Sequence, residues 1–336
     1  MPNQRTIETL TEIWHRVLQR SPIAPGDNFF DLNGDPLLAN QLFAEIAKQF
    51  DRELSPLTIY QAPTIAALAA VLEEPDLPRF PAVLKLKAGT EMPPVFMIHG
   101  LCSSVMEFFE LVKHIDSLRP IYGVQARGLD GVDEPYERLE DLAEFYLNAI
   151  RSVQPHGPYT FVGYSFGGLV AMEMAQRLSA SGEKTALLVM VETYPYRSHV
   201  PLGQFIGISV RRAKRRFAKA LRRAGLLSPA PIDLGEKEPY SPKAGKKFTA
   251  VMRSVCVKGF LAFERYRPQR YKGRINFIRA TTSLHILPAN PHAVWDRLAD
   301  EFLVETAPGG HWGIVTTQYK ALAGILSRYL KLSAGG

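Results

Sequence analysis

The sequence contains little cysteine and no long apolar run. Cys102 and Cys256 are the only cysteines among 336 residues, which is too few for a disulfide framework and is typical of a reducing compartment. The first residues lack the apolar core of a signal peptide, and no later run approaches the length of a membrane span. Zinc-ligand spacing, a P-loop and nucleic-acid-binding motifs are missing as well. We therefore expect a cytoplasmic protein without a bound metal ion, a transmembrane segment or nucleic acid.

Length and composition favour a globular protein with two domains of unequal size. A chain of 336 residues is long for one typical core, and 46% hydrophobic against 22% charged residues is ordinary for a globular chain. We expect a helical domain at residues 1–75, a linker at residues 76–92 and a larger domain at residues 93–333. Prolines interrupt any periodicity in the linker, which we expect to end in the first strand of the larger domain.

The stretch from Pro158 to Leu178 carries the most informative motif. Its first residues are β-branched and aromatic, which predicts a buried strand, and its later apolar residues recur at helical spacing. Between them, residues 163–167 (GYSFG) fit the pattern G-x-S-x-G. A sharp turn from strand to helix at this pattern forms a nucleophile elbow. We interpret Ser165 as a catalytic nucleophile, against the alternative of a glycine-rich turn with an incidental serine.

From Pro93 onward, strands and helices alternate. This alternation predicts a mostly parallel sheet with helices on both faces. Together with the nucleophile elbow, it indicates an α/β-hydrolase. The predicted strands cover residues 95–99, 120–125, 159–162, 185–191, 274–280 and 302–306, and a closing helix covers residues 319–332.

Acyl transfer by a serine also needs a base, and the order serine, acid, histidine is typical of this class. His311 lies in a glycine-flanked loop just after the last predicted strand, where that order places the base. The competing histidines, His99, His285 and His292, all precede that strand. We therefore predict that His311 is the base.

The acid has two candidates. The strand TALLVMV ends directly in Glu192, where a carboxylate faces the crevice at the carboxyl edge of an open sheet. After the strand RINFIRA the next carboxylate is Asp296, which is much farther along the chain. We predict the triad Ser165, Glu192 and His311.

Backbone N–H groups must stabilise the negative charge that develops on the substrate oxygen. One should come from Phe166, the residue after the nucleophile, and the other from Leu101, in the loop after the strand VFMIH. Cys102 lies in the same loop, but no strand, elbow and helix surround it. We interpret it as a small lining residue.

Residues 1–75 show helical spacing of apolar residues, with Thr64 as the expected cap of the last helix. Within them, Asp27 to Ala39 (DNFFDLNGDPLLA) resembles the segment D-N-F-F-D-L-G-G-x-S-L-L-A of acyl and peptidyl carrier domains, whose serine carries phosphopantetheine. Pro36 stands at the place of that serine, and Asn33 replaces the first glycine. The resemblance implies a carrier-like helix bundle without a phosphopantetheine attachment, because proline has no hydroxyl group.

Residues 93–333 resemble the type I thioesterase domain that ends nonribosomal peptide and polyketide synthases. The resemblance rests on PPVFMIHGLCSSVMEF, GYSFGGLVAMEMAQRL, LLVMVETYP, YRPQRYKGRINFIRA and APGGHWGI, in that family's order. It implies an acid, usually aspartate, after the strand that follows the elbow helix, which independently selects Glu192. It also implies a helical lid in the long insertion at about residues 196–270, and a substrate thioester of phosphopantetheine with no cofactor bound to the thioesterase itself.

The predicted lid contains a strongly basic segment. Arg211 to Arg223 holds eight basic residues, more than the net charge of +7 of the whole chain. One interpretation is a solvated helix face. The other is a docking surface for an acidic partner, such as a carrier domain, or for an anionic membrane surface.

Three functions follow from these observations. The first is a serine thioesterase of secondary-metabolite biosynthesis, which releases an acyl or peptidyl group by hydrolysis or intramolecular transfer through an acyl-Ser165 intermediate. Its substrate would arrive in trans on another carrier, because Pro36 cannot hold one. The second is an adaptor without turnover, which Pro36 favours. The third, a generic carboxylesterase, is disfavoured by the carrier-like N-terminus.

Overall fold

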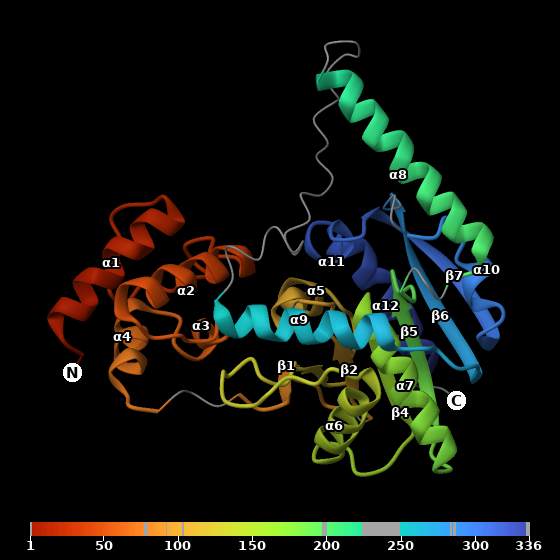
Figure 1. Cartoon of the computed structure of the whole chain (residues 1–336). Coiled ribbons are helices and arrows are strands. Elements are labelled where there is room, and N and C mark those ends of the chain that lie inside the picture. Colours follow the sequence, from red (N-terminus) through yellow and green to blue (C-terminus); the bar gives the residue numbers. More distant parts are fainter. Residues whose placement is uncertain are drawn as a thin grey trace. The chain divides into compact units, whose positions relative to one another are not determined.

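The computed structural model describes residues 2–76, 80–91, 93–102, 104–196, 200–223, 249–282, 284 and 287–333 (Figure 1). It divides into two compact units. One comprises Met1–Ala82, Ala126–Tyr136 and Glu238–Gly259, and the other comprises Val83–Gln125, Glu137–Lys237 and Phe260–Gly336. Parts of the predicted linker and lid lie outside the described residues, as do His285 and the side chains of Pro36 and of most residues between Arg211 and Arg223.

Polar side chains cap three of the N-terminal helices. The carboxylate of Asp35 accepts a hydrogen bond from the Leu38 N–H at 2.7 Å, and the Thr64 hydroxyl accepts one from the Ala67 N–H at 3.1 Å. The first helix has Asn3 as its cap. The helices are α1 (Gln4–Leu18), α2 (Pro36–Phe50), α3 (Thr58–Gln61) and α4 (Ile65–Glu73). The predicted helical N-terminus is confirmed, and α2 begins at Pro36. Proline is tolerated in the first turn because the N–H group that it lacks would have no acceptor within the helix there.

The core between these helices is aromatic and aliphatic. Trp14 and Phe29 are fully buried, and their rings meet edge to face with centroids 5.3 Å apart. Leu10 from α1, Phe43 from α2 and Leu68 from α4 complete this core. The apolar spacing in the sequence therefore produces one packed helical core.

In the part of the chain that the structure describes, seven strands form a single sheet in the order β1-β3-β2-β4-β5-β6-β7. Among these strands, β1 runs antiparallel to its neighbour, and the other pairs are parallel. The strands are β1 (Val83–Lys87), β2 (Val95–Ile98), β3 (Ile121–Val124), β4 (Tyr159–Tyr164), β5 (Thr185–Val191), β6 (Tyr271–Thr282) and β7 (Ala299–Gly310). The predicted α/β-hydrolase architecture is confirmed, although β6 and β7 extend beyond their predicted ends.

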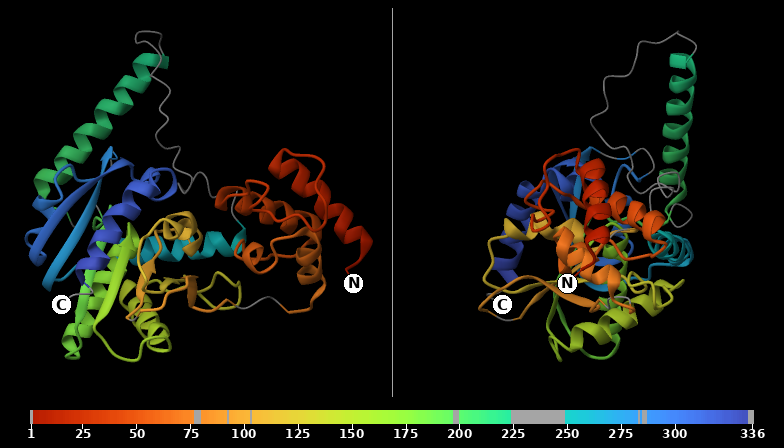
Figure 2. Two further views of the ribbon diagram at one scale, coloured as in Figure 1. Left: turned by 180° about the vertical axis from the view of Figure 1, so that it is seen from behind. Right: turned by 90° about the vertical axis from the view of Figure 1, so that its left-hand side faces the viewer.

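Helices cover both faces of this sheet (Figures 1 and 2). On one face, alternate residues of β2, β4, β5 and β6 share a buried cluster with α5 (Phe109–Lys113), α11 (Gly313–Thr316) and α12 (Tyr319–Ser333). The helices α6 (Leu139–Arg151) and α7 (Phe166–Ala180) pack together, and α7 also packs on β4 and β5. The remaining short elements are the 3₁₀ turn η1 (Val105–Phe108) and the helix α10 (His292–Trp295). Because β2 to β7 are parallel, their carboxyl ends lie at the same edge of the sheet, and this is where ligands bind in open α/β sheets.

The turn from β4 to α7 is as sharp as the sequence predicts. Ser165 adopts φ 53°, in the left-handed region that L-residues rarely occupy. A Cβ atom on Gly163 would lie 2.4 Å from the Gly167 carbonyl oxygen, and one on Gly168 would lie 1.9 Å from the Thr193 hydroxyl. Only glycine permits this approach between α7 and the end of β5, so the packing fixes the position of Ser165.

The long insertion between β5 and β6 contributes α8 (Leu202–Arg223) and α9 (Ala250–Arg265). Phe263, near the end of α9, lies edge to face against Phe166, with ring centroids 6.1 Å apart. The insertion therefore reaches the residue next to Ser165. Among the described residues, no helix is long and apolar enough to span a lipid bilayer.

Candidate active site

The structure brings the three predicted side chains into one hydrogen-bonded row. Ser165 follows β4, Glu192 follows β5, and His311 follows β7. The Ser165 Oγ lies 3.1 Å from Nε2 of His311, and the His311 Nδ1 lies 3.3 Å from Oε2 of Glu192. His311 is 6% exposed and Glu192 only 2% exposed. This order of hydroxyl, imidazole and buried carboxylate is the arrangement that activates a serine.

The backbone around Glu192 orients its carboxylate. The second oxygen, Oε1, accepts the Ala280 N–H at 2.8 Å, and the Glu192 N–H donates to the Ile278 carbonyl at 2.9 Å. Both partners belong to β6, so the neighbouring strand holds the acid at the end of β5. Glu192 has φ 48°, a strained conformation that tertiary contacts must maintain.

Asp296, the alternative acid, lies elsewhere. Its side chain is 57% exposed, and its carboxylate pairs with Nδ1 of His292 at 3.0 Å. His292 is half exposed as well, so this pair lies in solvent. The structure therefore brings Glu192, and not Asp296, to His311.

The loop after β2 is held from two sides at Gly100. The Gly100 N–H donates to Oε1 of the buried Glu107 at 2.6 Å, and the Gly100 carbonyl accepts from Nδ1 of His99 at 2.7 Å. Because the Gly100 N–H is already used, the predicted donor, Leu101, carries the next backbone N–H along the loop. Phe166 opens α7, and the first N–H groups of a helix have no acceptor within it.

His99 is itself locked in place. Its Nε2 lies 3.0 Å from the hydroxyl of Tyr146, which projects from α6. Complete burial lowers the pKa of His99 to about 4, so the ring is neutral at pH 7. The sequence places His99 at the end of the strand VFMIH, just before the predicted oxyanion loop, but does not indicate the contacts with Glu107 and Tyr146. The signal for Glu107 is a single carboxylate within the short apolar stretch VMEFF.

The cysteines differ from expectation. Cys102 is 3% exposed and has φ 56°, consistent with a small buried residue of this loop. However, both Cys102 and Cys256 are disulfide-bonded. The structure thus corrects the expectation of reduced thiols, and the cellular compartment stays a prediction.

A further contact, which no pattern in the sequence indicates, joins the end of β4 to His311. The Tyr164 hydroxyl donates to the His311 backbone carbonyl at 2.7 Å, and the two rings lie 5.4 Å apart. Tyr164 is 1% exposed and immediately precedes Ser165. It therefore ties the loop of the base to the end of β4 from the buried side.

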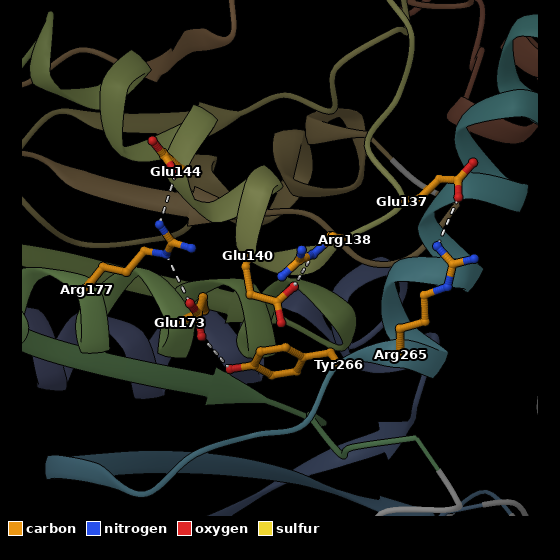
Figure 3. Close-up of polar contacts among 8 residues, drawn as sticks. All are labelled: Glu137, Arg138, Glu140, Glu144, Glu173, Arg177, Arg265 and Tyr266. Atoms are coloured by element: carbon orange, nitrogen blue, oxygen red, sulfur yellow. Dashed lines mark hydrogen bonds and ion pairs between the residues drawn. The ribbon is translucent and has the colours of Figure 1, made fainter.

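Polar contacts anchor the end of α9 near α6 and α7 (Figure 3). The Tyr266 hydroxyl donates to Glu173 of α7 at 3.0 Å, and Arg265 forms an ion pair with Glu137 at 2.9 Å. Burial is the main cause that raises the pKa of Tyr266 well above its usual value, so it stays a hydrogen-bond donor. Glu173 also accepts from Arg177 at 3.0 Å. These contacts fix the part of the insertion that carries Phe263 against Phe166.

Comparison with known families assigns both parts of the chain. Residues 93–330 match the thioesterase domain family, and residues 8–72 match the phosphopantetheine attachment site family. The chain is 32% identical over 280 residues to malpibaldin synthetase of Mortierella alpina, covering 81% of this chain and 5% of that protein. It is 31% identical over 287 residues to a dimodular nonribosomal peptide synthase of Bacillus subtilis, covering 82% of this chain and 12% of that protein. The chain thus spans only a small part of these relatives.

Solved structures share the fold. A holo four-domain nonribosomal peptide synthetase bound to AMP and glycine aligns with a TM-score of 0.60 at 22% identity, covering 98% of this chain and 26% of that one. The type II thioesterase BorB from the borrelidin biosynthetic cluster aligns with a TM-score of 0.55 at 17% identity, covering 76% of this chain and 100% of that one. Because the family match covers most of the chain, it belongs to the thioesterase domain family, with a domain of the phosphopantetheine attachment site family ahead of the thioesterase.

Proposed function

We propose that the chain is a serine thioesterase that releases an acyl or peptidyl group from a phosphopantetheine thioester, in secondary-metabolite biosynthesis. The observation that carries this proposal is the continuous row from Ser165 through His311 to the buried Glu192. Membership of the thioesterase domain family, and relatives that are nonribosomal peptide synthetases, support the same class of substrate.

The first half-reaction forms an acyl-enzyme. Nε2 of His311 takes the proton of Ser165 while Oγ attacks the thioester carbonyl carbon. The backbone N–H groups of Phe166 and Leu101 stabilise the resulting oxyanion. The carbon–sulfur bond then breaks, and the pantetheine sulfur leaves with the proton held by His311. Glu192 stabilises the imidazolium and keeps the neutral ring in the tautomer that can accept from serine.

The second half-reaction releases the acyl group. His311 now deprotonates a water molecule, or a hydroxyl or amine of the acyl chain itself. That nucleophile attacks the ester carbonyl, and Ser165 leaves with the proton returned by His311. The chain length between nucleophile and carbonyl in the substrate decides between hydrolysis and cyclisation.

We also propose that the N-terminal domain has lost its prosthetic group. Its family carries phosphopantetheine, which requires a serine hydroxyl as the attachment point. Residues 33–40 (NGDPLLAN) contain no hydroxyl side chain, and α2 begins at Pro36. The residues at the start of α2 therefore do not fit the group, and the thioester substrate arrives in trans, on another carrier or as a free thioester.

Mass spectrometry tests the proposal directly. The full chain, mixed with a panel of acyl-pantetheine thioesters, should gain the mass of the acyl group on Ser165. The Ser165→Ala variant should show neither adduct nor turnover, while its melting temperature stays within a few degrees because the elbow serine packs against little. Thioester turnover by Ser165→Ala close to wild type would refute the assignment.

A non-catalytic adaptor is the second candidate, and Pro36 is the feature that favours it. Labelling with a fluorophosphonate separates the two, because only an activated serine reacts.

We further propose domain limits of 1–75, 76–92 and 93–333, with a lid at about 196–270. The family matches at 8–72 and 93–330 support these limits. Because β1 (Val83–Lys87), within 76–92, is a strand of the sheet, limited proteolysis should first cut between residues 76 and 82.

A further inference from the structure

The helix α8 exposes an apolar stripe that no core uses. Leu202, Ile206, Val210 and Phe217 are 72%, 52%, 47% and 67% exposed. Together with the exposed Ala213 they recur at spacings of four, four, three and four residues, which is the repeat of one helix face. Four large apolar side chains in one row along an exposed face are unusual, because a helix normally buries such a row.

The second half of α8 is rich in basic residues. The sequence places eight Lys and Arg residues between Arg211 and Arg223, and no acid occurs anywhere from Leu202 to Arg223. The exposed Lys214 is one of these basic residues. By the helical repeat of about 3.6 residues, the positions of the basic residues fall outside the apolar row. The charged positions of α8 are therefore all cationic and lie outside the apolar row.

The buried contact of α8 lies away from the apolar row. Ile208 is 3% exposed, two positions from both Ile206 and Val210. Two positions along a helix correspond to about 200° of rotation, so the side on which α8 packs is nearly opposite the exposed row. Burial of Ile208 thus leaves Leu202, Ile206 and Val210 exposed.

We infer that α8 lies on an anionic lipid surface. Helices that rest in the plane of a membrane interface combine a strong apolar side, a Lys- and Arg-rich polar side and low overall hydrophobicity. The 22 residues of α8 would cover about 33 Å of that surface. An acidic carrier domain would satisfy the cationic side alone, whereas a lipid surface accommodates both the charges and the exposed apolar row.

Charge and apolar contact should both be necessary. Each Lys or Arg close to an anionic surface strengthens binding by about fivefold. Salt should weaken the electrostatic contribution to membrane binding, because the Debye length falls to about 3 Å at about 1 M salt. Removing apolar side chains should weaken the hydrophobic contribution even in low salt.

Vesicle flotation of the full chain tests the inference. Phosphatidylcholine vesicles that contain phosphatidylglycerol should carry the protein upward, and pure phosphatidylcholine vesicles should not. The double variant Ile206→Ser/Phe217→Ser should bind at least about tenfold more weakly. The double variant Lys214→Gln/Arg222→Gln should bind about 25-fold more weakly in low salt.

Matched controls use exposed residues outside α8. Leu118→Ser/Leu332→Ser removes two apolar side chains that are 61% and 78% exposed, and Lys184→Gln/Lys320→Gln removes two exposed charges. Both controls should float like wild type, and circular dichroism checks that every variant keeps its helix content. Equal binding to neutral vesicles, no binding to anionic vesicles, or full binding by Ile206→Ser/Phe217→Ser would each overturn the inference. So would binding of an acidic carrier protein under conditions where vesicles are not bound.

Discussion

Replacing Glu192 with glutamine should disable the enzyme without unfolding it. The carboxylate has two roles, accepting the Ala280 N–H through Oε1 and the His311 Nδ1–H through Oε2. A glutamine can keep its oxygen toward Ala280, which leaves an NH₂ group facing Nδ1. His311 must then carry its proton on Nε2, and that nitrogen can no longer accept the proton of Ser165. In a serine protease triad, the same loss of the correct histidine tautomer lowers kcat about 10⁴-fold. This factor corresponds to about 5.5 kcal/mol of activation free energy.

The assay is hydrolysis of an acyl-pantetheine thioester, which is monitored through the free thiol that it releases. Wild type, Glu192→Gln, Glu192→Asp and Asp296→Asn are compared under the same conditions. The stability of Glu192→Gln should fall by about 1 kcal/mol, because only one hydrogen bond changes. Asp296→Asn should retain full activity, since its carboxylate pairs with the exposed His292. An inactive Asp296→Asn together with an active Glu192→Gln would show that the acid is assigned to the wrong residue.

Three other substitutions probe contacts described above. Tyr164→Phe leaves the buried His311 carbonyl without its 2.7 Å donor, so urea unfolding should show a free energy of unfolding lower by about 1–3 kcal/mol. In the same variant kcat should fall while KM stays constant, and an unchanged kcat would contradict a positioning role. The pKa of His99 is lowered to about 4 in the folded state against 6.5 unfolded, so below pH 6.5 the unfolded state binds the extra proton first. Stability should therefore fall by about 3 kcal/mol between pH 6.5 and 4, and His99→Asn should flatten this part of the urea-unfolding profile. Pro36→Ser should allow a phosphopantetheinyl transferase to add the arm from coenzyme A, detected by intact mass; the same mass gain on wild type would disprove the loss of the attachment site.

The parts of the site predicted from sequence are those that depend on local order along the chain. Ser165 is recognisable because glycines, a strand and a helix surround it, and Glu192 because it ends a strand. The predicted length of β7 is too short, because Pro308 and the two glycines after it suggest a loop. An edge strand such as β7 tolerates proline where its backbone N–H would face away from the neighbouring strand. The Tyr164–His311 contact joins residues 147 positions apart. It depends on how the last loop folds back, which no local pattern encodes.

Because the proposed acid, Glu192, follows β5, the connection after β6 carries none of the proposed triad residues and is open to engineering. Ala289 and Asn290 are exposed there, and Asn290 accepts the His292 N–H at the start of α10. The Trp295 indole N–H donates to the Thr193 carbonyl next to Glu192, so α10 itself should stay intact. An affinity tag or a fluorophore-bearing peptide inserted between Ala289 and Asn290 would leave α10 and Glu192 in place, and would provide a reporter on the same edge of the sheet as the reaction.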